Sequence, residues 1–493
     1  MMGGITDLPV EVLDTVFRYC STESLISLRA VATVFKEIAD SGGRVKCSLK
    51  SRDFSNSSFR LYFDNSRKLT VTIADILNHK YNGLGFALSC LRDVSLYAFP
   101  SNSSEELSYF HSKLDAVLMP LESEVEDVKL ESLSMNCLVA HWADFDRFID
   151  RINASTLDFS VKTNIYLSLA PGPLLPEYPI LLSRKFQDVT FCFTDFIDFP
   201  STLFQLGPLS GDKFFSMFEF SQDSQLRRLL LLNEKSHSVP VLNPAHLSKF
   251  LSPCRQLEEI ELDSIDLKGN VDNTVDWFPS SLQMLSFAYS GLYVTSSYQP
   301  SKQFRPNCNV HRIDTTGLRK IIGDDQYISL FEHVNFPNLT ELNLDMDLQI
   351  HSSLFLTNVL GTLKSLNLYL ADWDVLDTKI NDAFKTSPLT NLFIEVQSGT
   401  LDSEKMNYIK NLRNLESLTL VLNVDLATCS RDNINTTFGM FLKDLLSNCR
   451  HIQDVKVGND VTPCLNLPIT SVDRFSIANL DLSAYKNPNT LIT

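Results

Sequence analysis

The segment SLFLTNVLGTLKSLNL, residues 353–368, contains two hydrophobic periods in succession. Its first ten residues place apolar side chains at helical spacing, whereas its last six, LKSLNL, alternate apolar and polar side chains. Alternation with period two over so few residues predicts a short strand that buries one face. The segment therefore predicts one helix followed by one strand, a unit too small to close a core unless further copies stack on it.

The strand pattern L-x-x-L-x-L recurs along the chain. Its clearest copies are LEEIEL at 257, LQMLSF at 282, LTELNL at 339, LKSLNL at 363, LTNLFI at 389 and LESLTL at 415. Weaker copies begin at Leu91, Val125, Phe186, Leu226, Val310, Ile452 and Val472. The last four clear copies are 24, 26 and 26 residues apart, which is the period of leucine-rich repeats. We therefore expect an α/β solenoid of degenerate leucine-rich repeats over residues 50–485, with parallel strands lining a curved horseshoe, and a tail at 486–493.

Helical patterns precede several of these strands, namely PAHLSKFLSPCRQ (244–256), YISLFEHVNFPN (327–338), EKMNYIKNLRN (404–414) and GMFLKDLLSNCRH (439–451). Two of them carry a cysteine, Cys254 or Cys449, at the same repeat position after the helix and before the strand. We interpret both cysteines as small buried residues and not as nucleophiles or metal ligands.

Composition and charge restrict the function. The formal net charge is −16 at pH 7 and the sequence pI is about 5.0, which argues against binding to nucleic acid or to an anionic membrane. The ten cysteines include no CxxC pair, so we expect reduced thiols, no metal site and no cofactor. No apolar run is long enough to cross a bilayer and no secretion signal is evident, so we expect a cytoplasmic or nuclear protein.

The segment DLPVEVLDTVFRYCSTESLISLRAVATVFKEIAD, residues 7–40, contains two amphipathic helical stretches. So short a segment cannot bury all of its apolar side chains against itself. It must therefore dock either on the rest of its own chain, as a cap, or on a partner protein.

In residue type, order and spacing this segment resembles an F-box, and the resemblance covers about 40 residues. It departs from the usual pattern in having Ala32 after the valine and Phe35 at the closing aromatic position. The resemblance implies an F-box of three short helices over residues 1–45 that binds the Skp adaptor of an SCF ubiquitin ligase. The residues that would bind the adaptor are Leu8, Pro9, Val12, Leu13, Val16, Phe17, Leu25, Leu28, Val31 and Phe35.

Residues between the strand leucines are expected to face the concave surface of the solenoid. We take as candidate substrate-binding residues Glu259, Glu261, Asp263, Asp314, Asn343, Asp345, Asn367 and Tyr369. This row is acidic from Glu259 to Asp345, which is compatible with a plain solvated face or with a surface that attracts a basic protein segment. Near Tyr369, Trp373 could add aromatic anchoring or could simply pack in the core.

No catalytic motif is evident, since GxxxxGK[ST], GxSxG and HExxH are all absent. By resemblance, the chain is a non-catalytic substrate receptor that holds a protein for ubiquitination while cullin and RING subunits, recruited through the Skp adaptor, bring the conjugating enzyme. One alternative is a scaffold that binds the Skp adaptor without cullin. Another is a repeat protein whose first helices are only a cap.

Overall fold

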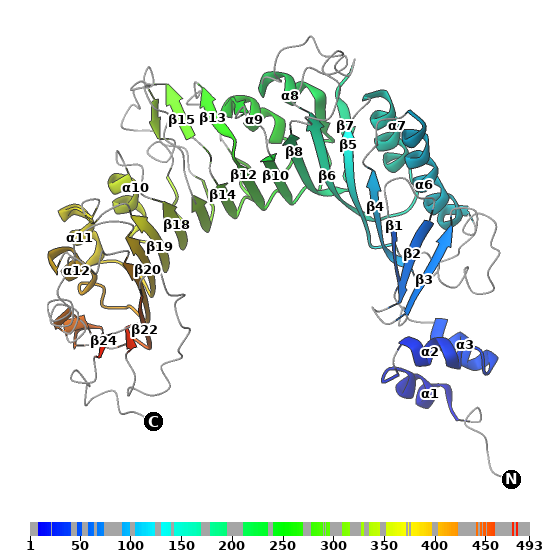
Figure 1. Ribbon diagram of the computed structural model, residues 1–493, viewed down its shortest axis with the longest axis horizontal. Helices are drawn as coiled ribbons and strands as arrows, with labels where there is room; N and C mark the ends of the chain where they lie inside the picture. The colour runs from blue at the N-terminus through cyan, green and yellow to red at the C-terminus, as the bar shows by residue number, and fades with distance from the viewer. Residues whose placement is uncertain are drawn as a thin grey trace. The chain divides into compact units, whose positions relative to one another are not determined.

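The structure, a computed structural model, is shown in Figure 1. It describes residues 8–20, 22–40, 47–51, 58–63, 67–72, 91–98, 104–123, 130–139, 142–168, 178–194, 211–234, 240–269, 278–288, 290, 292–295, 308–315, 327–329, 335–345, 352–370, 373, 376–396, 403–422, 440–441, 444–445, 447–449, 451–458, 476–477 and 480–481. The chain forms two compact units. The N-terminal unit is Met1–Ser238 with Pro253–Gln256, and the C-terminal unit is Val239–Ser252 with Leu257–Thr493.

The N-terminal unit begins with three short helices, α1 (Val10–Phe17), α2 (Thr22–Leu28) and α3 (Thr33–Asp40). Pro9 caps α1, and its carbonyl oxygen accepts hydrogen bonds from the amides of Val12 at 3.0 Å and Leu13 at 3.1 Å. Helices α1 and α2 both contact α3. The three helices enclose a small core of their own, made of Leu13, Phe17, Leu25, Phe35, Ile38 and Ala39.

The strands of the N-terminal unit start with an antiparallel meander and continue as a parallel array. The meander is β1 (Cys47–Ser51), β2 (Ser58–Phe63) and β3 (Arg67–Thr72). The parallel strands that follow β1 in space are β4 (Leu91–Ala98), β5 (Ser132–Val139), β6 (Ser160–Ser168), β8 (Phe186–Thr194) and β10 (Arg228–Glu234).

Further elements complete this unit. They are α6 (Ser104–Ser123), α7 (Trp142–Asn153) and α8 (Gly211–Met217), with β7 (Ile180–Leu182) pairing in parallel with β9 (Phe218–Phe220). Helix α6 follows β4 and α7 follows β5, so the strand–helix alternation expected of the repeats is present here.

The C-terminal unit contains the most regular repeats, and its main strands are all parallel. They are, in spatial order, β12 (Glu259–Asp263), β14 (Met284–Ala288), β16 (Arg312–Thr315), β18 (Glu341–Asp345), β19 (Ser365–Leu370), β20 (Asn391–Val396), β21 (Ser417–Leu422) and β22 (Asp454–Gly458). The helices are α9 (Pro244–Leu251), α10 (Ser352–Val359), α11 (Thr378–Phe384) and α12 (Ser403–Ile409). Figure 1 shows α10, α11 and α12 along one side of β18–β20.

Two smaller sheets accompany these strands. One contains β11 (Val241–Leu242), β13 (Asp266–Gly269), β15 (Leu292–Thr295) and β17 (Tyr327–Ser329). The other contains β23 (Ser476–Ile477) and β24 (Leu480–Asp481).

The strand pairing confirms the repeat that the sequence predicts. Leu342, Leu366, Leu392 and Leu418 lie side by side in register on β18–β21, and all four are buried. Just before these strands, one carbonyl accepts two amides from the next repeat: the oxygen of Thr340 accepts from Lys364 at 2.8 Å and from Ser365 at 3.0 Å. The same arrangement recurs at the next two steps. Stacked copies thus satisfy each other's backbone groups and share one apolar core, as a solenoid requires.

Three sequence-based assignments differ from the structure. The weak copy placed at Val125 is out of register, because β5 belongs to the overlapping copy LESLSM that begins at Leu130. Strand β6 was not predicted, since its segment lacks the leucine pattern. Tyr327–Ser329, expected to begin a helix, form strand β17, in keeping with the β propensity of Tyr and Ile. The copy at Val472 lies largely outside the described residues, which include only β23 there.

Candidate functional site

Helices α1–α3 expose several large apolar side chains although their own core is closed. The exposed fractions are 42% for Leu8, 44% for Val12, 46% for Val16 and 68% for Val31. Leu8, Val12 and Val16 are four residues apart and so lie on one stripe of the α1 segment. We call the exposed set Leu8, Pro9, Val12, Val16 and Val31 the apolar face. An exposed apolar stripe such as that of Leu8, Val12 and Val16 is typical of a docking surface.

The ten residues that the F-box resemblance selects fall into three groups by exposure. Exposed are Leu8, Pro9, Val12, Val16 and Val31, and Leu28 is half-buried. Buried are Leu13, Phe17, Leu25 and Phe35, of which Phe17 and Phe35 make an edge-to-face contact with ring centroids 5.4 Å apart. The buried residues therefore shape the three-helix module, and the exposed ones are available to a partner.

Two further apolar side chains on this module are exposed and were not selected from the sequence, namely Val10 (55%) and Tyr19 (88%). The helical spacing from Val16 to Tyr19 could have indicated that Tyr19 continues the stripe. Another side of the same segment is polar, with an ion pair of 3.1 Å between Arg18 and Asp14. This polar side supplies control positions that are independent of the apolar face.

The candidate substrate-binding residues lie on the open side of the C-terminal strands, since the residues alternating with them are buried. Seven of them are half-buried there, namely Glu259, Glu261, Asp263, Asp314, Asn343, Asn367 and Tyr369. The backbone of Asp345 pairs in register with Tyr369. The side chain of Asp345 is not among those that the structure describes. The face also carries a cation that the sequence reasoning overlooked. Arg312 lies 4.0 Å from Asp314 and 3.9 Å from Glu341. The row is therefore acidic but partly neutralised.

Trp373 is 4% exposed, so it packs in the core and is not a surface anchor. The buried thiols are equally unsuited to chemistry. Burial raises the pKa of Cys254 to about 12 and that of Cys449 to about 11, which keeps both protonated at neutral pH. Cys449 donates its thiol hydrogen to the carbonyl of Leu412 at 2.8 Å. Both cysteines are thus small buried residues, as expected.

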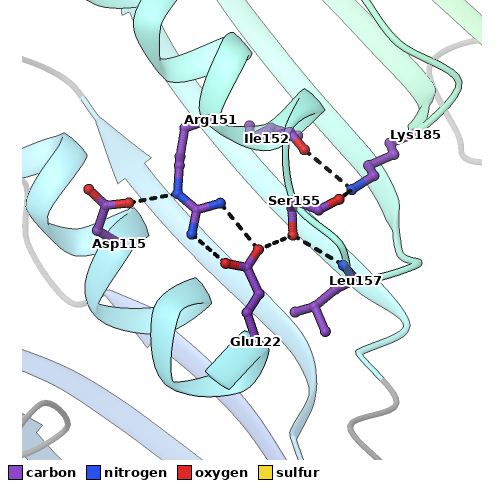
Figure 2. Close-up of polar contacts among 7 residues, drawn as sticks. All are labelled: Asp115, Glu122, Arg151, Ile152, Ser155, Leu157 and Lys185. Carbon is purple, nitrogen blue, oxygen red and sulfur yellow. Dashed lines mark hydrogen bonds and ion pairs between the residues drawn. The ribbon is translucent and has the colours of Figure 1, made fainter. Parts of the chain in front are cut away.

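A polar network in the N-terminal unit joins two neighbouring helices (Figure 2). The guanidinium of Arg151 on α7 donates two hydrogen bonds to Glu122, at 2.8 and 3.2 Å, and a third to Asp115 at 2.8 Å. Ser155 donates to Glu122 at 2.5 Å. The buried ammonium of Lys185 donates to the carbonyls of Ile152 and Ser155, at 3.3 and 2.5 Å. A cation at the last turn of α7 stabilises that helix end.

We interpret this network as structural, because each charged group is committed to another part of the fold. Burial opposes ionisation of Glu122, but hydrogen bonds from Arg151 and Ser155 outweigh burial and hold the pKa of Glu122 below its ordinary value of 4.5. Burial, in turn, lowers the pKa of Lys185. The carboxylate of Glu122 thus contributes stability that is fully present above pH 4.5 and is lost as the pH falls through its lowered folded-state pKa.

Replacing Glu122 with Gln is expected to lower the free energy of unfolding at neutral pH by about 1–3 kcal/mol, because charge-assisted hydrogen bonds to Arg151 are lost. The difference from the wild type should shrink as the pH falls below 4.5. Urea unfolding over that pH range measures both effects. Arg147→Gln is the control, since its side chain is 78% exposed and its ion pair with Asp144 is 3.9 Å long. An equal loss for Glu122→Gln at all pH values would contradict the assignment.

The described residues contain no metal-binding group and no membrane-spanning helix. No group of three or more His, Cys, Asp or Glu side chains there could hold a metal ion. Within the same residues, no helix is both long enough and apolar enough to cross a membrane.

Comparison with known proteins gives one domain match. The family model for the F-box domain matches residues 5–45, a range that contains α1–α3 and the apolar face. No curated protein matches the sequence. Matching solved structures include the leucine-rich repeat-containing protein LegL7 from Legionella pneumophila, with 13% sequence identity and a TM-score of 0.31. That match covers 76% of this chain and 92% of LegL7.

Proposed function

Starting from the F-box domain at residues 5–45, we propose that the chain is the substrate-recognition subunit of an SCF-type ubiquitin ligase. One observation carries the proposal: α1–α3 close their own small core and still expose the apolar face. A cap that docks on its own solenoid would bury such residues. Exposed Leu8 and Val16 therefore favour a partner protein, and F-box domains bind Skp-type adaptors.

The F-box residues divide into two roles under this proposal. Leu8, Pro9, Val12, Val16 and Val31 contact the adaptor directly. Leu13, Phe17, Leu25 and Phe35 hold the three helices in the geometry that presents this face, since all four are buried within the module. Leu28, half-buried, lies at the margin of the contact.

The ligase activity would come from proximity and not from chemistry on this chain. The Skp adaptor would recruit cullin and RING subunits, which bring a conjugating enzyme charged with ubiquitin. The repeats would hold a substrate protein, and the effective concentration of its lysines near the thioester would rise. The chain itself would be non-catalytic, would need no cofactor and would act in the cytoplasm or nucleus.

Substrate capture belongs on the open strand face of the C-terminal unit in this account. That face carries the carboxylates of Glu259, Glu261, Asp263 and Asp314, with Arg312 as a partial counter-charge. Charge complementarity then favours a substrate with a basic segment.

Affinity capture of the full chain tests the proposal, with blots for the Skp adaptor and for cullin and with a Leu8→Ala, Pro9→Ala double variant beside it. Capture of both partners by the wild type and loss of both in the variant is the expected result. Adaptor without cullin would favour the alternative of an F-box scaffold outside the ligase. If neither is captured, the F-box does not act as an adaptor-binding module.

A further inference from the structure

The open strand face of the C-terminal unit changes character from one end to the other. Across β12–β18 it presents carboxylates, which we call the acidic half: Glu259, Glu261, Asp263, Asp314 and Glu341. On β19 and β20 it presents two half-buried rings, Tyr369 and Phe393, with centroids 5.4 Å apart and planes tilted by 46°, and one carboxylate, Glu395, beside Tyr369. We call Tyr369 and Phe393 the aromatic pair. A partner that covers this face therefore contacts mainly carboxylates on β12–β18 and both aromatic rings and a carboxylate on β19 and β20.

The described open-face positions of β12–β18 carry more carboxylates than cations. Arg312 is the one cation at the described open-face positions of β12–β18, and it lies between Asp314 and Glu341. Asn343 donates a hydrogen bond to Asp314 at 3.2 Å without adding charge. Carboxylates therefore outnumber cations on these strands, which favours a cationic partner and disfavours an anionic one.

The aromatic pair has the properties of an anchor site. Tyr369 and Phe393 are diagonal neighbours on adjacent strands, since Tyr369 pairs with Glu395 and Phe393 pairs with Asn367. Both rings are on the open side and only half-buried. Aromatic side chains in this position contribute strongly when a partner's apolar side chain completes their burial.

The strand register fixes the distance between the two halves. Glu261, Ser286, Asp314, Asn343, Asn367 and Phe393 form one row across neighbouring strands. Neighbouring strands are about 4.8 Å apart, so Asp314 lies about 14 Å from Phe393 and Glu261 about 24 Å along this row. An extended chain advances about 3.3–3.6 Å per residue. These distances correspond to about four to seven residues.

We propose that this face binds an extended protein segment that runs across the strands and carries two features. One is an apolar or aromatic residue that packs on the aromatic pair. The other is one or more Lys or Arg residues, about four to seven positions away, that lie over the acidic half. This inference rests on the proposed function, since it specifies the class of substrate segment that the repeats would capture.

Open-face positions of the N-terminal unit supply control substitutions, because they belong to the other compact unit. Its open positions include Ser95, Ser134, Asn136, Lys162 and Asn164, and Asn164 donates a hydrogen bond to Asn136 at 2.6 Å. These five residues are neutral or basic, and two carboxylates, Asp93 and Asp188, lie at open positions of the same face. Substitutions there should not affect a cationic segment bound to the C-terminal unit.

The test uses the full chain and a set of synthetic peptides, each with an Arg-Arg pair and one Phe separated by one to ten Gly and Ser residues. Fluorescence anisotropy measures their dissociation constants. We expect the tightest binding when about three to six residues intervene, which places the nearer Arg about four to seven positions from the Phe. Phe393→Ala, and separately Glu261→Gln with Asp314→Asn, should each weaken the best peptide about tenfold or more. Phe393→Leu, which keeps an apolar side chain, should weaken it less, and Lys162→Ala should leave it unchanged.

Absence of binding, binding that does not depend on the separation, or binding unaffected by Phe393→Ala would overturn the inference. Circular dichroism of each variant checks that it is folded. Titration of every variant with purified Skp adaptor separates this inference from the proposed ligase role. A wild-type chain that does not bind the adaptor but binds peptides according to their separation would refute the ligase role alone. A wild-type chain that binds the adaptor but shows no dependence on peptide separation would refute the peptide inference alone.

Discussion

Replacement of Phe35 with Ala is expected to unfold α1–α3 and thereby to abolish adaptor binding. Phe35 is 1% exposed and packs edge-to-face on Phe17 across the module. Removing a buried phenylalanine side chain costs about 3–5 kcal/mol. A core as small as that of three short helices has little stability in reserve, so a loss of this size should shift the module to the unfolded state.

Hydrogen–deuterium exchange of the full chain measures this effect locally. In Phe35→Ala, the amides of α1–α3 should lose protection, while those of β18–β21 should keep it. Val31→Ala is the matched control, because Val31 is 68% exposed and makes little contribution to the core. Retained protection of α1–α3 in Phe35→Ala would mean that Phe35 does not hold the module together.

The double change of Val12 and Val16 to Lys is expected to weaken adaptor binding by at least about 100-fold without unfolding the helices. Val12 and Val16 are 44% and 46% exposed, so completing their burial contributes about half of the 1.5–3 kcal/mol for a fully exposed side chain, or about 1.5–3 kcal/mol for the two together. Desolvation of two lysine charges in an apolar contact adds about 2 kcal/mol or more, and the total of about 3 kcal/mol or more is at least about 100-fold in affinity. Lysine is also a good helix former, so α1 should persist. The variant thus separates loss of the apolar face from loss of the fold.

Titration of the variant with purified Skp adaptor gives the affinity, and circular dichroism gives the helix content. Arg18→Ala on the polar side of the same segment should bind as the wild type does, since it loses only an exposed ion pair with Asp14. An unchanged affinity in the Val12, Val16 variant would place the adaptor elsewhere on the chain.

Much of the fold is predictable because it repeats. The spacing of Leu339, Leu363, Leu389 and Leu415 predicts strands that the structure has in register, with their leucines buried. Prediction fails where the pattern is ambiguous or absent. Around Val125 and Leu130 two overlapping copies fit the same pattern, and local periodicity cannot choose between them. For β17, tertiary pairing with β15 overrides a pattern that also suits a helix.

The sequence predicts which residues make up the candidate site but not which of their side chains are exposed. The F-box pattern selects ten apolar residues, yet only the packing of α1 and α2 on α3 separates exposed Val16 from buried Phe17. The N-terminal network was not foreseen, because Glu122 lies on α6, Arg151 on α7 and Lys185 in the turn before β8, far apart in the sequence. The aromatic pair depends on the register of β19 with β20, which no single segment encodes.

Size-exclusion chromatography with light scattering, on the purified full chain mixed with purified Skp adaptor, tests the central claim most directly. The account predicts a complex with one copy of each protein, formed by the wild type and by Arg18→Ala but not by the Val12, Val16 double Lys variant. The account would be contradicted if the folded wild-type chain eluted separately from the adaptor at concentrations far above the dissociation constants of typical stable complexes.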